Sequence, residues 1–167
     1  KIRNNDECIL PAICWSTSLW PIVQSGLKPV FIDVDLNTFN LNLDHLEKKI
    51  NKRTKVILAV HILGNCTNMN KLIKIINKKK ITLIEDTCES LGSIYNNKYL
   101  GTFGRYGTYS FYVSHQMTAG EGGMIVCNNI EDYKIIHALR AHGWDRGLFK
   151  KNNRNFNFVN SGFNLRP

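Results

Sequence analysis

The sequence predicts an α/β fold in which a mostly parallel sheet is flanked by helices. Two observations support this prediction. Runs such as Val30–Val34 and Lys55–Val60 are almost continuously apolar, as is typical of strands covered on both faces. Amphipathic segments such as 69–79 alternate with these runs. Strands that alternate with helices at this spacing favour right-handed βαβ units, and therefore a parallel sheet.

The first strand and helix are predicted near the start of the chain. Residues 7–12 (ECILPA) are typical of a short buried strand. We expect a hydroxyl among residues 16–18 to cap a helix over 19–25, because Ser and Thr are favoured at helix N-termini. Pro21 then falls in the first turn, where its missing N–H is tolerated, and Gly26 closes the helix.

The remaining elements follow from the spacing of apolar residues and of turn residues. They are a strand at 30–34, a helix at 43–51, a strand at 55–60, a loop at 61–68, a helix at 69–79, a strand at 81–84, a hairpin at 95–99 with an Asn-Asn turn, a helix at 132–142 and an irregular segment at 143–167.

The stretch 107–124 (GTYSFYVSHQMTAGEGGM) carries the one imidazole that we single out. A strand is predicted at 108–113, followed by a polar loop with His115, a glycine turn and a second strand at 124–127. A titratable group on a loop between two strands is typical of a catalytic position. An ordinary hairpin with a surface histidine is the alternative.

Other polar or flat side chains are expected at strand ends. Asp86 follows the strand at 81–84, and Trp15 lies on a strand-to-helix loop. In open parallel sheets, ligands bind at the carboxyl ends of the strands. We therefore expect Asp86, Trp15 and the loop of His115 to converge there, although Trp15 is also compatible with an ordinary core position.

Composition excludes several classes of function. The net charge of +9 comes from scattered basic residues that are not interleaved with stacking aromatics, so nucleic-acid binding is disfavoured. No apolar run approaches the roughly 20 residues needed to span a bilayer. The five cysteines form no CxxC pair and no cluster at metal spacing, which predicts no metal site. Buried free thiols favour a reducing compartment, and hence the cytoplasm.

Several spaced motifs together resemble a known family. Asp86 precedes CESLG at 88–92, GTFG follows at 101–104, and SFYVSHQMTAGEGGMIV follows at 110–126. This order is similar to the DegT/DnrJ/StrS sugar aminotransferases, and GFNLR at 162–166 looks like their GxNxR segment. The resemblance implies part of the large domain of a fold-type-I enzyme that uses pyridoxal 5'-phosphate. Residues 1–167 would form the central part of that domain, without its N-terminal segment and without the C-terminal small domain.

One departure from the family pattern points to a subgroup. Family aminotransferases carry a lysine five residues after the strand serine, where it bonds covalently to the cofactor, but here Ser110 is followed at that distance by His115. An imidazole cannot form that bond. The same replacement is known in the family's sugar 3-dehydratases, which this chain also resembles at 140–144 (RAHGW). The resemblance thus implies removal of the C3 hydroxyl from a nucleotide-linked 4-keto-6-deoxy sugar, with pyridoxamine 5'-phosphate as cofactor and His115 as base, in deoxysugar and lipopolysaccharide biosynthesis.

The resemblance also implies roles for five further residues. Asp86 would hold a proton on the pyridine nitrogen, Trp15 would stack on the ring and Ser110 would bind the phosphate. Asn164 would reach the phosphate of a neighbouring subunit's cofactor, which implies a homodimer with shared sites. Glu89 would contact the ring hydroxyl or the substrate. The alternatives are a capping role for Asp86 and a solvated helix carboxylate at Glu89.

Two branches of dehydratases exist in this family. One uses an iron–sulfur cluster, and the absence of any cysteine after Cys127 disfavours it. The other acts on GDP-4-keto-6-deoxymannose without a cluster and regenerates its amine from glutamate, and we favour it. Two other functions stay open: a sugar aminotransferase in which another group replaces the lysine, and a catalytically inactive relative that binds sugar nucleotides.

Overall fold

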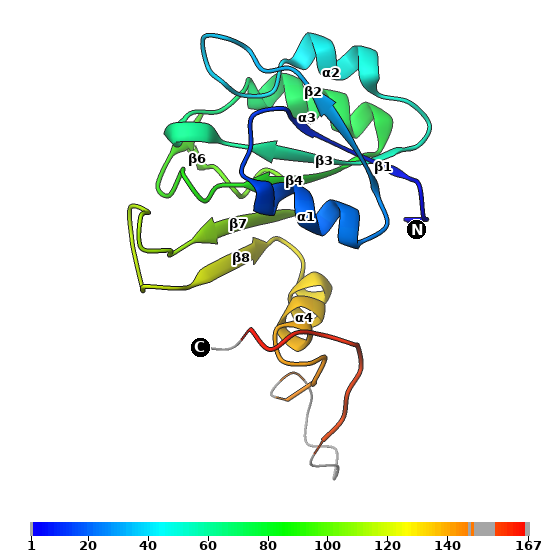
Figure 1. Cartoon of the computed structure of the whole chain (residues 1–167), viewed down its shortest axis with the longest axis vertical. Helices are drawn as coiled ribbons and strands as arrows, with labels where there is room; N and C mark the ends of the chain where they lie inside the picture. The colour runs from blue at the N-terminus through cyan, green and yellow to red at the C-terminus, as the bar shows by residue number, and fades with distance from the viewer. Residues whose placement is uncertain (1, 147, 149–155, 166–167) are drawn as a thin grey trace. The chain divides into compact units, whose positions relative to one another are not determined.

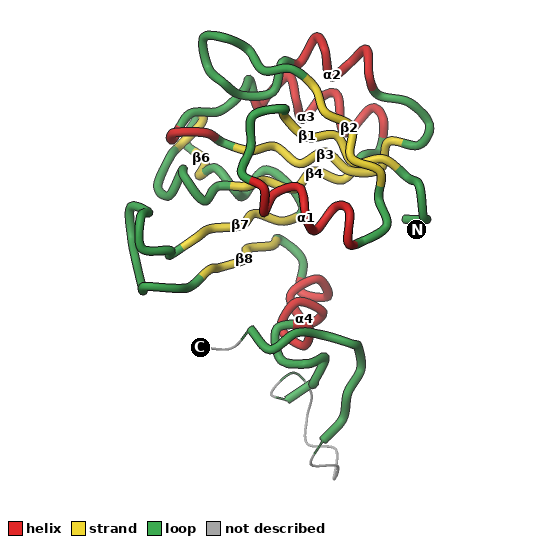
Figure 2. Tube along the Cα trace, in the orientation of Figure 1, coloured by secondary structure: helices red, strands yellow, loops and turns green. Residues whose placement is uncertain are grey.

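The computed structural model describes residues 2–146, 148 and 156–165. The chain divides into two compact units, Lys1–Val126 and Cys127–Pro167. Figures 1 and 2 show the course of the chain and its secondary structure. In chain order, the elements are β1 (Glu7–Pro11), α1 (Ser16–Gln24), β2 (Lys28–Ile32), α2 (Leu43–Lys49), β3 (Thr54–Val60), the 3-10 turn η1 (Ile62–Gly64), α3 (Met69–Lys79), β4 (Thr82–Asp86), β5 (Ile94–Tyr95), β6 (Lys98–Tyr99), β7 (Tyr106–Ser110), β8 (Gly123–Cys127) and α4 (Ile130–Leu139).

The main sheet has six strands in the order β2-β1-β3-β4-β7-β8. The pairs β1–β2, β1–β3, β3–β4 and β4–β7 are parallel. Figure 1 shows β8 running opposite to β7, at the edge of the sheet. The predicted α/β fold with a mostly parallel sheet is therefore confirmed. Because five strands are parallel, their carboxyl ends lie at one edge of the sheet.

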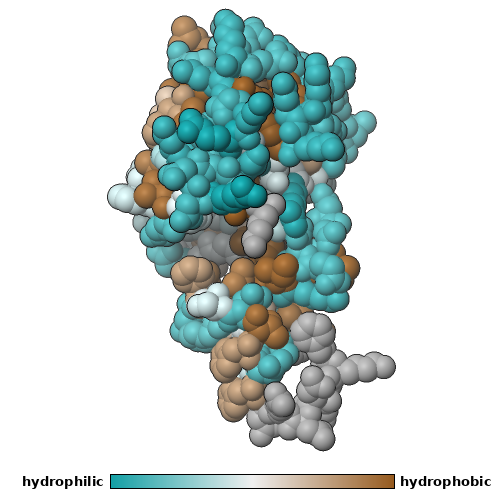
Figure 3. Space-filling model, turned by 90° about the vertical axis from the view of Figure 1, so that its right-hand side faces the viewer, coloured by the Kyte–Doolittle hydropathy of each residue, from teal (hydrophilic) through white to brown (hydrophobic). Residues whose placement is uncertain are grey.

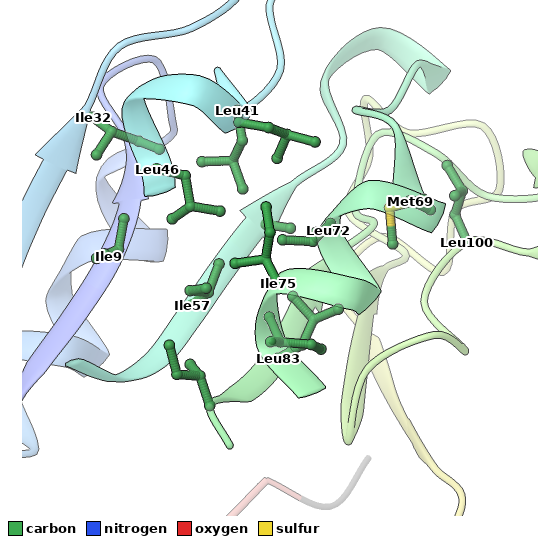
Figure 4. Packing of buried hydrophobic residues seen from close by; sticks show 14 residues of the cluster. Ile9, Ile32, Leu41, Leu46, Ile57, Met69, Leu72, Ile75, Leu83 and Leu100 are labelled. Carbon is green, nitrogen blue, oxygen red and sulfur yellow. The ribbon is translucent and has the colours of Figure 1, made fainter. Parts of the chain in front are cut away.

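One face of the sheet packs against α2 and α3. Alternate strand residues, such as Ile9, Ile57 and Leu83, contribute to this cluster, which is fully buried at its centre. Helix α3 contributes the apolar side of its surface to this cluster, and α2 contributes two leucines. Figure 4 shows Leu72 and Ile75 of α3 above these strand residues. The amphipathic pattern at 69–79 thus correctly predicted this helix.

The opposite face of the sheet packs against α1. The intervening strand residues point to this side, and Ile22 of α1 joins them in a second cluster. Leu10 and Leu58 belong to this cluster, whereas their neighbours Ile9 and Ile57 belong to the first one. This alternation, in which successive side chains of a strand point to opposite faces, also determines which polar side chains share a face at the strand ends.

The structure corrects the predicted start of α1. The helix begins at Ser16, three residues before the predicted position, and its N-cap is Trp15, which makes no capping hydrogen bond with its side chain. The prediction was wrong because the hydroxyl of Ser18 donates to another element instead of capping the helix. Pro21 consequently lies inside the helix and not in its first turn. Gly26 ends the turn with a φ of +77°, as predicted.

Other boundaries differ by a few residues from the predicted ones. Strand β2 begins and ends two residues earlier than predicted, because it pairs residue by residue with β1. Helix α4 also begins two residues earlier, because Asn129 accepts hydrogen bonds from two backbone N–H groups of the first turn. Strand β7 ends at Ser110 and does not continue to Val113. The Asn-Asn hairpin between β5 and β6 is confirmed, and both of its turn residues have a positive φ.

The second unit contains α4 and the segments that follow it. Apart from α4, its described residues form two isolated bridges, Ala141 with Asn164 and Trp144 with Phe158. The ring of Trp144 also stacks on that of Phe156, with 5.0 Å between the centroids. The prediction of an irregular segment after the helix is thus confirmed for the residues that the structure describes.

The surface is not uniformly polar. Figure 3 shows hydrophobic areas between hydrophilic ones on the face that it displays. In the first unit, exposed apolar side chains include Trp20 and Val23 of α1 and Ile125 of β8. None of the described helices combines the length and the hydropathy that a membrane crossing requires.

Candidate active site

The candidate site lies where β3, β4 and β7 end side by side. Asp86, the last residue of β4, is paired with Val60 on one side and with Thr108 on the other. The alternation of the strands places Asp86 on the face covered by α1, since Val60 and Ile84 belong to the second apolar cluster. Ser110 is two residues beyond Thr108 and therefore shares this face. Asp86 and Ser110, where the loop of His115 begins, thus lie on the same face at the carboxyl ends of β4 and β7.

The carboxylate of Asp86 is held by two donors. Oδ2 accepts a hydrogen bond from the hydroxyl of Ser18 at 2.7 Å, and Oδ1 accepts one from the backbone N–H of Cys88 at 3.2 Å. A carboxylate offers about four lone-pair positions, so acceptor capacity remains for a ligand. In the part of the chain that the structure describes, no lysine or arginine forms an ion pair with this carboxylate.

Two thiols near Asp86 are kept protonated. Burial raises the pKa of Cys88 to about 12, and the neighbouring Asp86 carboxylate contributes through a hydrogen bond and its charge. Burial also raises the pKa of Cys14, again with a contribution from the charge of Asp86. Neutral thiols are poor nucleophiles, so we expect both side chains to have low reactivity. All five cysteines are free, as predicted, but only Cys8 is fully buried.

Trp15 stands at the start of α1, one turn before Ser18. Its side chain is 75% exposed, so it is not a core residue of this chain. The backbone of Ser18 donates to the carbonyl of Trp15 at 3.0 Å, and the hydroxyl of Ser18 contacts Asp86. The indole is therefore carried by the same helical turn that contacts the carboxylate. It offers a flat apolar surface near the strand ends.

His115 lies on the loop between β7 and β8. Its backbone N–H donates to the carbonyl of Tyr112 at 3.0 Å, and its ring meets that of Tyr112 edge-on, with 6.3 Å between the centroids. Ser110, at the start of this loop, accepts a hydrogen bond from the N–H of Tyr112 at its hydroxyl oxygen. The hydroxyl proton of Ser110 can therefore still be donated to a ligand. The imidazole is half-buried and lies on this loop, five residues after the end of β7.

The segment after Asp86 is connected to the His115 loop by a residue that the sequence analysis missed. The side-chain amide of Gln116 donates to the carbonyl oxygen of Glu89 at 2.7 Å. The carboxylate of Glu89 in turn accepts the backbone N–H of Leu63 at 2.9 Å. Glu89 lies on a turn, so the alternative of a helix carboxylate is wrong. No local pattern of the sequence could reveal Gln116, because its partner is distant in the chain.

A second carboxylate, Glu85, lies on the other face of β4 and is fully buried. It accepts the backbone N–H groups of Gly101 at 2.8 Å and of Gly104 at 2.6 Å, and it contacts Nε2 of His61 at 3.0 Å. Side chains do not fit at the two glycines: a Cβ at Gly104 would lie 2.6 Å from the carbonyl oxygen of Leu83. The glycine motif at 101–104 thus folds around Glu85, and His61 has a structural partner.

Asn164 belongs to the second unit. It bridges to Ala141, and the neighbouring Leu165 donates its N–H to the carbonyl of Arg140 at 2.9 Å. Its side chain is exposed. Arg166, the last residue of the GFNLR segment, lies outside the described residues. The proposed role of Asn164 toward a second subunit stays a prediction.

The grouped side chains fit a flat heteroaromatic ring with an acidic tail. A carboxylate suits a protonated ring nitrogen, an indole suits the face of the ring, and a hydroxyl suits a phosphate. Among the described residues, no group of three or more His, Cys, Asp or Glu side chains could hold a metal ion. The only imidazole on the β7–β8 loop is His115, and that loop carries no lysine.

Comparison with known proteins agrees with this arrangement. Residues 1–166 match the model of the DegT/DnrJ/EryC1/StrS aminotransferase family. The chain is 43% identical, over 178 aligned residues, to GDP-4-keto-6-deoxy-D-mannose 3-dehydratase of Escherichia coli O55:H7, and it covers 46% of that protein. It is 40% identical over 178 residues to the protein of the same name from Yersinia pseudotuberculosis, of which it covers 45%. All of this chain is matched in both comparisons.

Solved structures show the same likeness. A variant of GDP-4-keto-6-deoxymannose-3-dehydratase with bound GDP-perosamine superposes with a TM-score of 0.95 at 42% identity, over 99% of this chain and 46% of that one. A structure under the same enzyme name, with a trapped PLP-glutamate geminal diamine, superposes with a TM-score of 0.92 at 42% identity and the same coverage. These likenesses confirm the predicted fold-type-I architecture. The chain spans about half the length of these relatives.

Proposed function

Because the chain belongs to the DegT/DnrJ/EryC1/StrS aminotransferase family, we propose that the protein containing it is a nucleotide-sugar 3-dehydratase that depends on pyridoxal or pyridoxamine 5'-phosphate. It would remove the C3 hydroxyl of a 4-keto-6-deoxy sugar. The observation that carries this proposal is His115, which stands on the β7–β8 loop where family aminotransferases have their lysine. The identity of 43% to a GDP-4-keto-6-deoxy-D-mannose 3-dehydratase supports it.

The residues at the strand ends would bind the cofactor. The carboxylate of Asp86 would receive the protonated ring nitrogen, Trp15 would cover one face of the ring, and the hydroxyl of Ser110 would donate to the phosphate. When bound, the cofactor supplies an electron sink for the loss of the hydroxyl. Asp86 would keep the ring nitrogen protonated, because a neutral pyridine withdraws electrons less strongly than a protonated one. The turn that carries Glu89 lies beside this carboxylate, and Glu89 would contact the ring hydroxyl or the sugar.

His115 would act as the general base. Near neutral pH, an imidazole in its neutral form can accept a proton at a ring nitrogen. It can then return this proton to the hydroxyl that leaves the sugar as water. A lysine amine with an ordinary pKa of about 10.4 is mostly protonated under the same conditions and would serve less well as a base.

The substrate and partners follow from the same premise. The relatives named above support GDP-4-keto-6-deoxymannose as the sugar nucleotide and glutamate as the amine donor. Residues 1–167 would form the central part of the cofactor-binding large domain. Asn164 would reach the cofactor phosphate of a neighbouring subunit in a homodimer. The free cysteines favour a reducing compartment, which we take to be the cytoplasm.

Two alternatives remain. A sugar aminotransferase is the first, because the family is named for this activity and the cofactor-binding residues would be shared. A sugar-nucleotide binding protein without catalysis is the second. Retention of Asp86 speaks against the second, because a protein that only binds sugar nucleotides has no need of a carboxylate beside the ring nitrogen.

Mass spectrometry of the sugar product separates these functions. The whole protein is incubated with pyridoxamine 5'-phosphate, GDP-4-keto-6-deoxymannose and glutamate. A 3-deoxy product that has lost water is expected. A 4-amino product would establish transamination instead, and an unchanged sugar together with a bound cofactor would favour a binding protein or a different sugar nucleotide.

A further inference from the structure

We propose that Ser18 is a positioning residue for the cofactor: its hydroxyl fixes the Asp86 carboxylate in the orientation that receives the ring nitrogen. The inference rests on the proposed function, because it assumes that a pyridine ring binds at Asp86. Ser18 is thereby added to the site. The sequence pattern suggested it only as a helix cap.

The hydrogen bond of Ser18 is long-range and shielded from water. Ser18 and Asp86 are 68 positions apart in the chain, and their side chains meet at 2.7 Å. Ser18 is only 7% exposed. Inside helices, serine hydroxyls commonly donate to the carbonyl four residues earlier. Here the hydroxyl donates to a carboxylate on the sheet instead, and a hydrogen bond to a charged group is among the stronger ones in proteins.

This bond and one other determine the plane of the carboxylate. Cys88 holds Oδ1 through its backbone N–H at 3.2 Å, and Ser18 holds Oδ2. A carboxylate with a donor on each oxygen cannot rotate without breaking one of the two bonds. Without the hydroxyl of Ser18, the Asp86 carboxylate would keep its hydrogen bonds to Cys88 but lose the one that holds Oδ2 from α1, and its side chain would rotate more freely. The bond to a ring N–H is directional, so this rotation weakens it.

The same hydroxyl also anchors the helix that carries Trp15. Trp15 is the N-cap of this helix, three residues before Ser18. The backbone N–H of Ser18 donates to the carbonyl of Trp15, so the two residues form one turn. The bond to Asp86 therefore fixes the position of the indole relative to the carboxylate. The indole would cover the face of the cofactor ring, and the carboxylate would bind the ring nitrogen.

The test uses the whole protein loaded with pyridoxal 5'-phosphate that is labelled with ¹⁵N in the ring. The variants are Ser18→Ala, Ser18→Thr and, as a matched control on the same helix, Ser25→Ala. The hydroxyl of Ser25 donates to the carbonyl of Ile22 at the far end of α1. The readouts are the ¹⁵N chemical shift of the ring nitrogen, which reports its protonation near neutral pH, and the dissociation constant of the cofactor.

We expect Ser18→Ala to move the ring nitrogen signal toward that of the unprotonated ring and to weaken cofactor binding by roughly tenfold, as expected for a lost bond to a charged group. Ser18→Thr keeps the hydroxyl and should retain both properties, and Ser25→Ala should match the unchanged protein. Wild-type values of the shift and of the affinity in Ser18→Ala would overturn the inference. So would a Ser18→Thr variant that behaves like Ser18→Ala while its circular dichroism matches that of Ser25→Ala.

Failure of the proposed function gives a different result. If the unchanged protein binds no pyridoxal 5'-phosphate, the ¹⁵N signal is that of the free cofactor in every sample. That outcome overturns the assignment of the site together with this inference. Normal binding in the unchanged protein, combined with no effect of Ser18→Ala, overturns the inference alone.

Discussion

At the scale of single residues, no hydrogen bond of the His115 imidazole ring is found in the described part of the chain. Its backbone N–H donates to the carbonyl of Tyr112, and its ring packs edge-on against the ring of Tyr112. The ring nitrogens thus stay available for a substrate proton. Buried His61 contrasts with it, since Nε2 of its ring contacts Glu85. The two histidines thus differ in the contacts that the structure gives their ring nitrogens.

The variant His115→Asn tests the role of the base. Asparagine retains polarity but cannot accept a proton from carbon, so we expect the rate of dehydration to fall by about 10² to 10⁴. Cofactor affinity should stay close to that of the unchanged protein. Turnover is measured by mass spectrometry of the sugar, and binding by cofactor absorbance.

His45→Asn is the matched control for this variant. His45 lies in α2, and its ring accepts the backbone N–H of Asp33 at 3.1 Å. Activity of this variant should remain near that of the unchanged protein. Loss of cofactor binding in His115→Asn would mean that His115 has a structural role, and full activity would exclude it as the base.

Cys88 gives a prediction about pH. Its pKa is raised from 9.0 to about 12, mainly by burial, and a thiol with a raised pKa remains protonated to higher pH. At about pH 8 its thiolate fraction should be about a thousandfold below that of an ordinary thiol, and the rate of alkylation should rise with pH over the range up to about pH 12. Iodoacetamide labelling followed by peptide mass spectrometry measures this rate, with glutathione as reference.

The variant Asp86→Asn sharpens this prediction. It removes the carboxylate charge that contributes to the raised pKa, so Cys88 should be alkylated faster than in the unchanged protein. The rate should still be below that of glutathione, because burial is the larger cause. Equal labelling of Cys88 and glutathione in the unchanged protein would contradict the structure around Asp86.

At the scale of elements, the sequence predicted the types of the main strands and helices because apolar periodicity is local. Helix α3 was predicted at both ends, and the Asn-Asn turn between β5 and β6 was predicted with its strands. The start of α1 was missed because Ser18 has a partner 68 positions away, which no local pattern contains. For the same reason, Gln116 and Glu85 were not found. Motif spacing predicted where Asp86 and Ser110 lie, but not what holds them.

The glycine loop that follows β4 can be tested with a matched pair of variants. Gly101 and Gly92 have similar φ values of +87° and +83°, so alanine at either position costs about 1 to 2 kcal/mol through the backbone. A Cβ at Gly101 would lie 2.5 Å from the hydroxyl of Tyr109, whereas a Cβ at Gly92 would meet nothing within 4 Å. Overpacking should therefore add about 1 to 3 kcal/mol to Gly101→Ala alone.

Urea denaturation of both variants measures the difference in the free energy of unfolding. Gly101→Ala should unfold at a clearly lower urea concentration than Gly92→Ala. Equal midpoints would show that the loop can relax around the new methyl group, and that its packing against Tyr109 is not a constraint.

At the scale of the whole molecule, the first unit exposes large apolar side chains on α1 and β8. Trp20 is 56% exposed, Val23 48% and Ile125 51%. In a protein as long as the relatives, of which this chain covers about half, further chain is available to cover them. We therefore expect residues 1–167, produced alone, to bind the dye ANS more strongly than the whole protein does, because ANS reports exposed apolar surface.

The variant Trp20→Gln tests this prediction in both proteins. It should lower ANS fluorescence of residues 1–167, whereas Leu36→Gln, at an exposed loop position away from α1 in the sequence, should change it little. In the whole protein, where we expect further chain to cover this position, Trp20→Gln should reduce stability. Equal ANS binding by both proteins would show that the surface of α1 remains open.

The two adjacent carboxylates of β4 have a consequence for evolution. Glu85 faces the glycine loop and Asp86 faces α1, because successive residues of a strand point to opposite sides. Deleting or inserting a single residue within β4 would exchange these directions and disable both carboxylates at once. The hairpin of β5 and β6, which lies outside the main sheet, carries no such constraint. Lineages of this protein should therefore vary in length at the hairpin and keep the length of β4 unchanged.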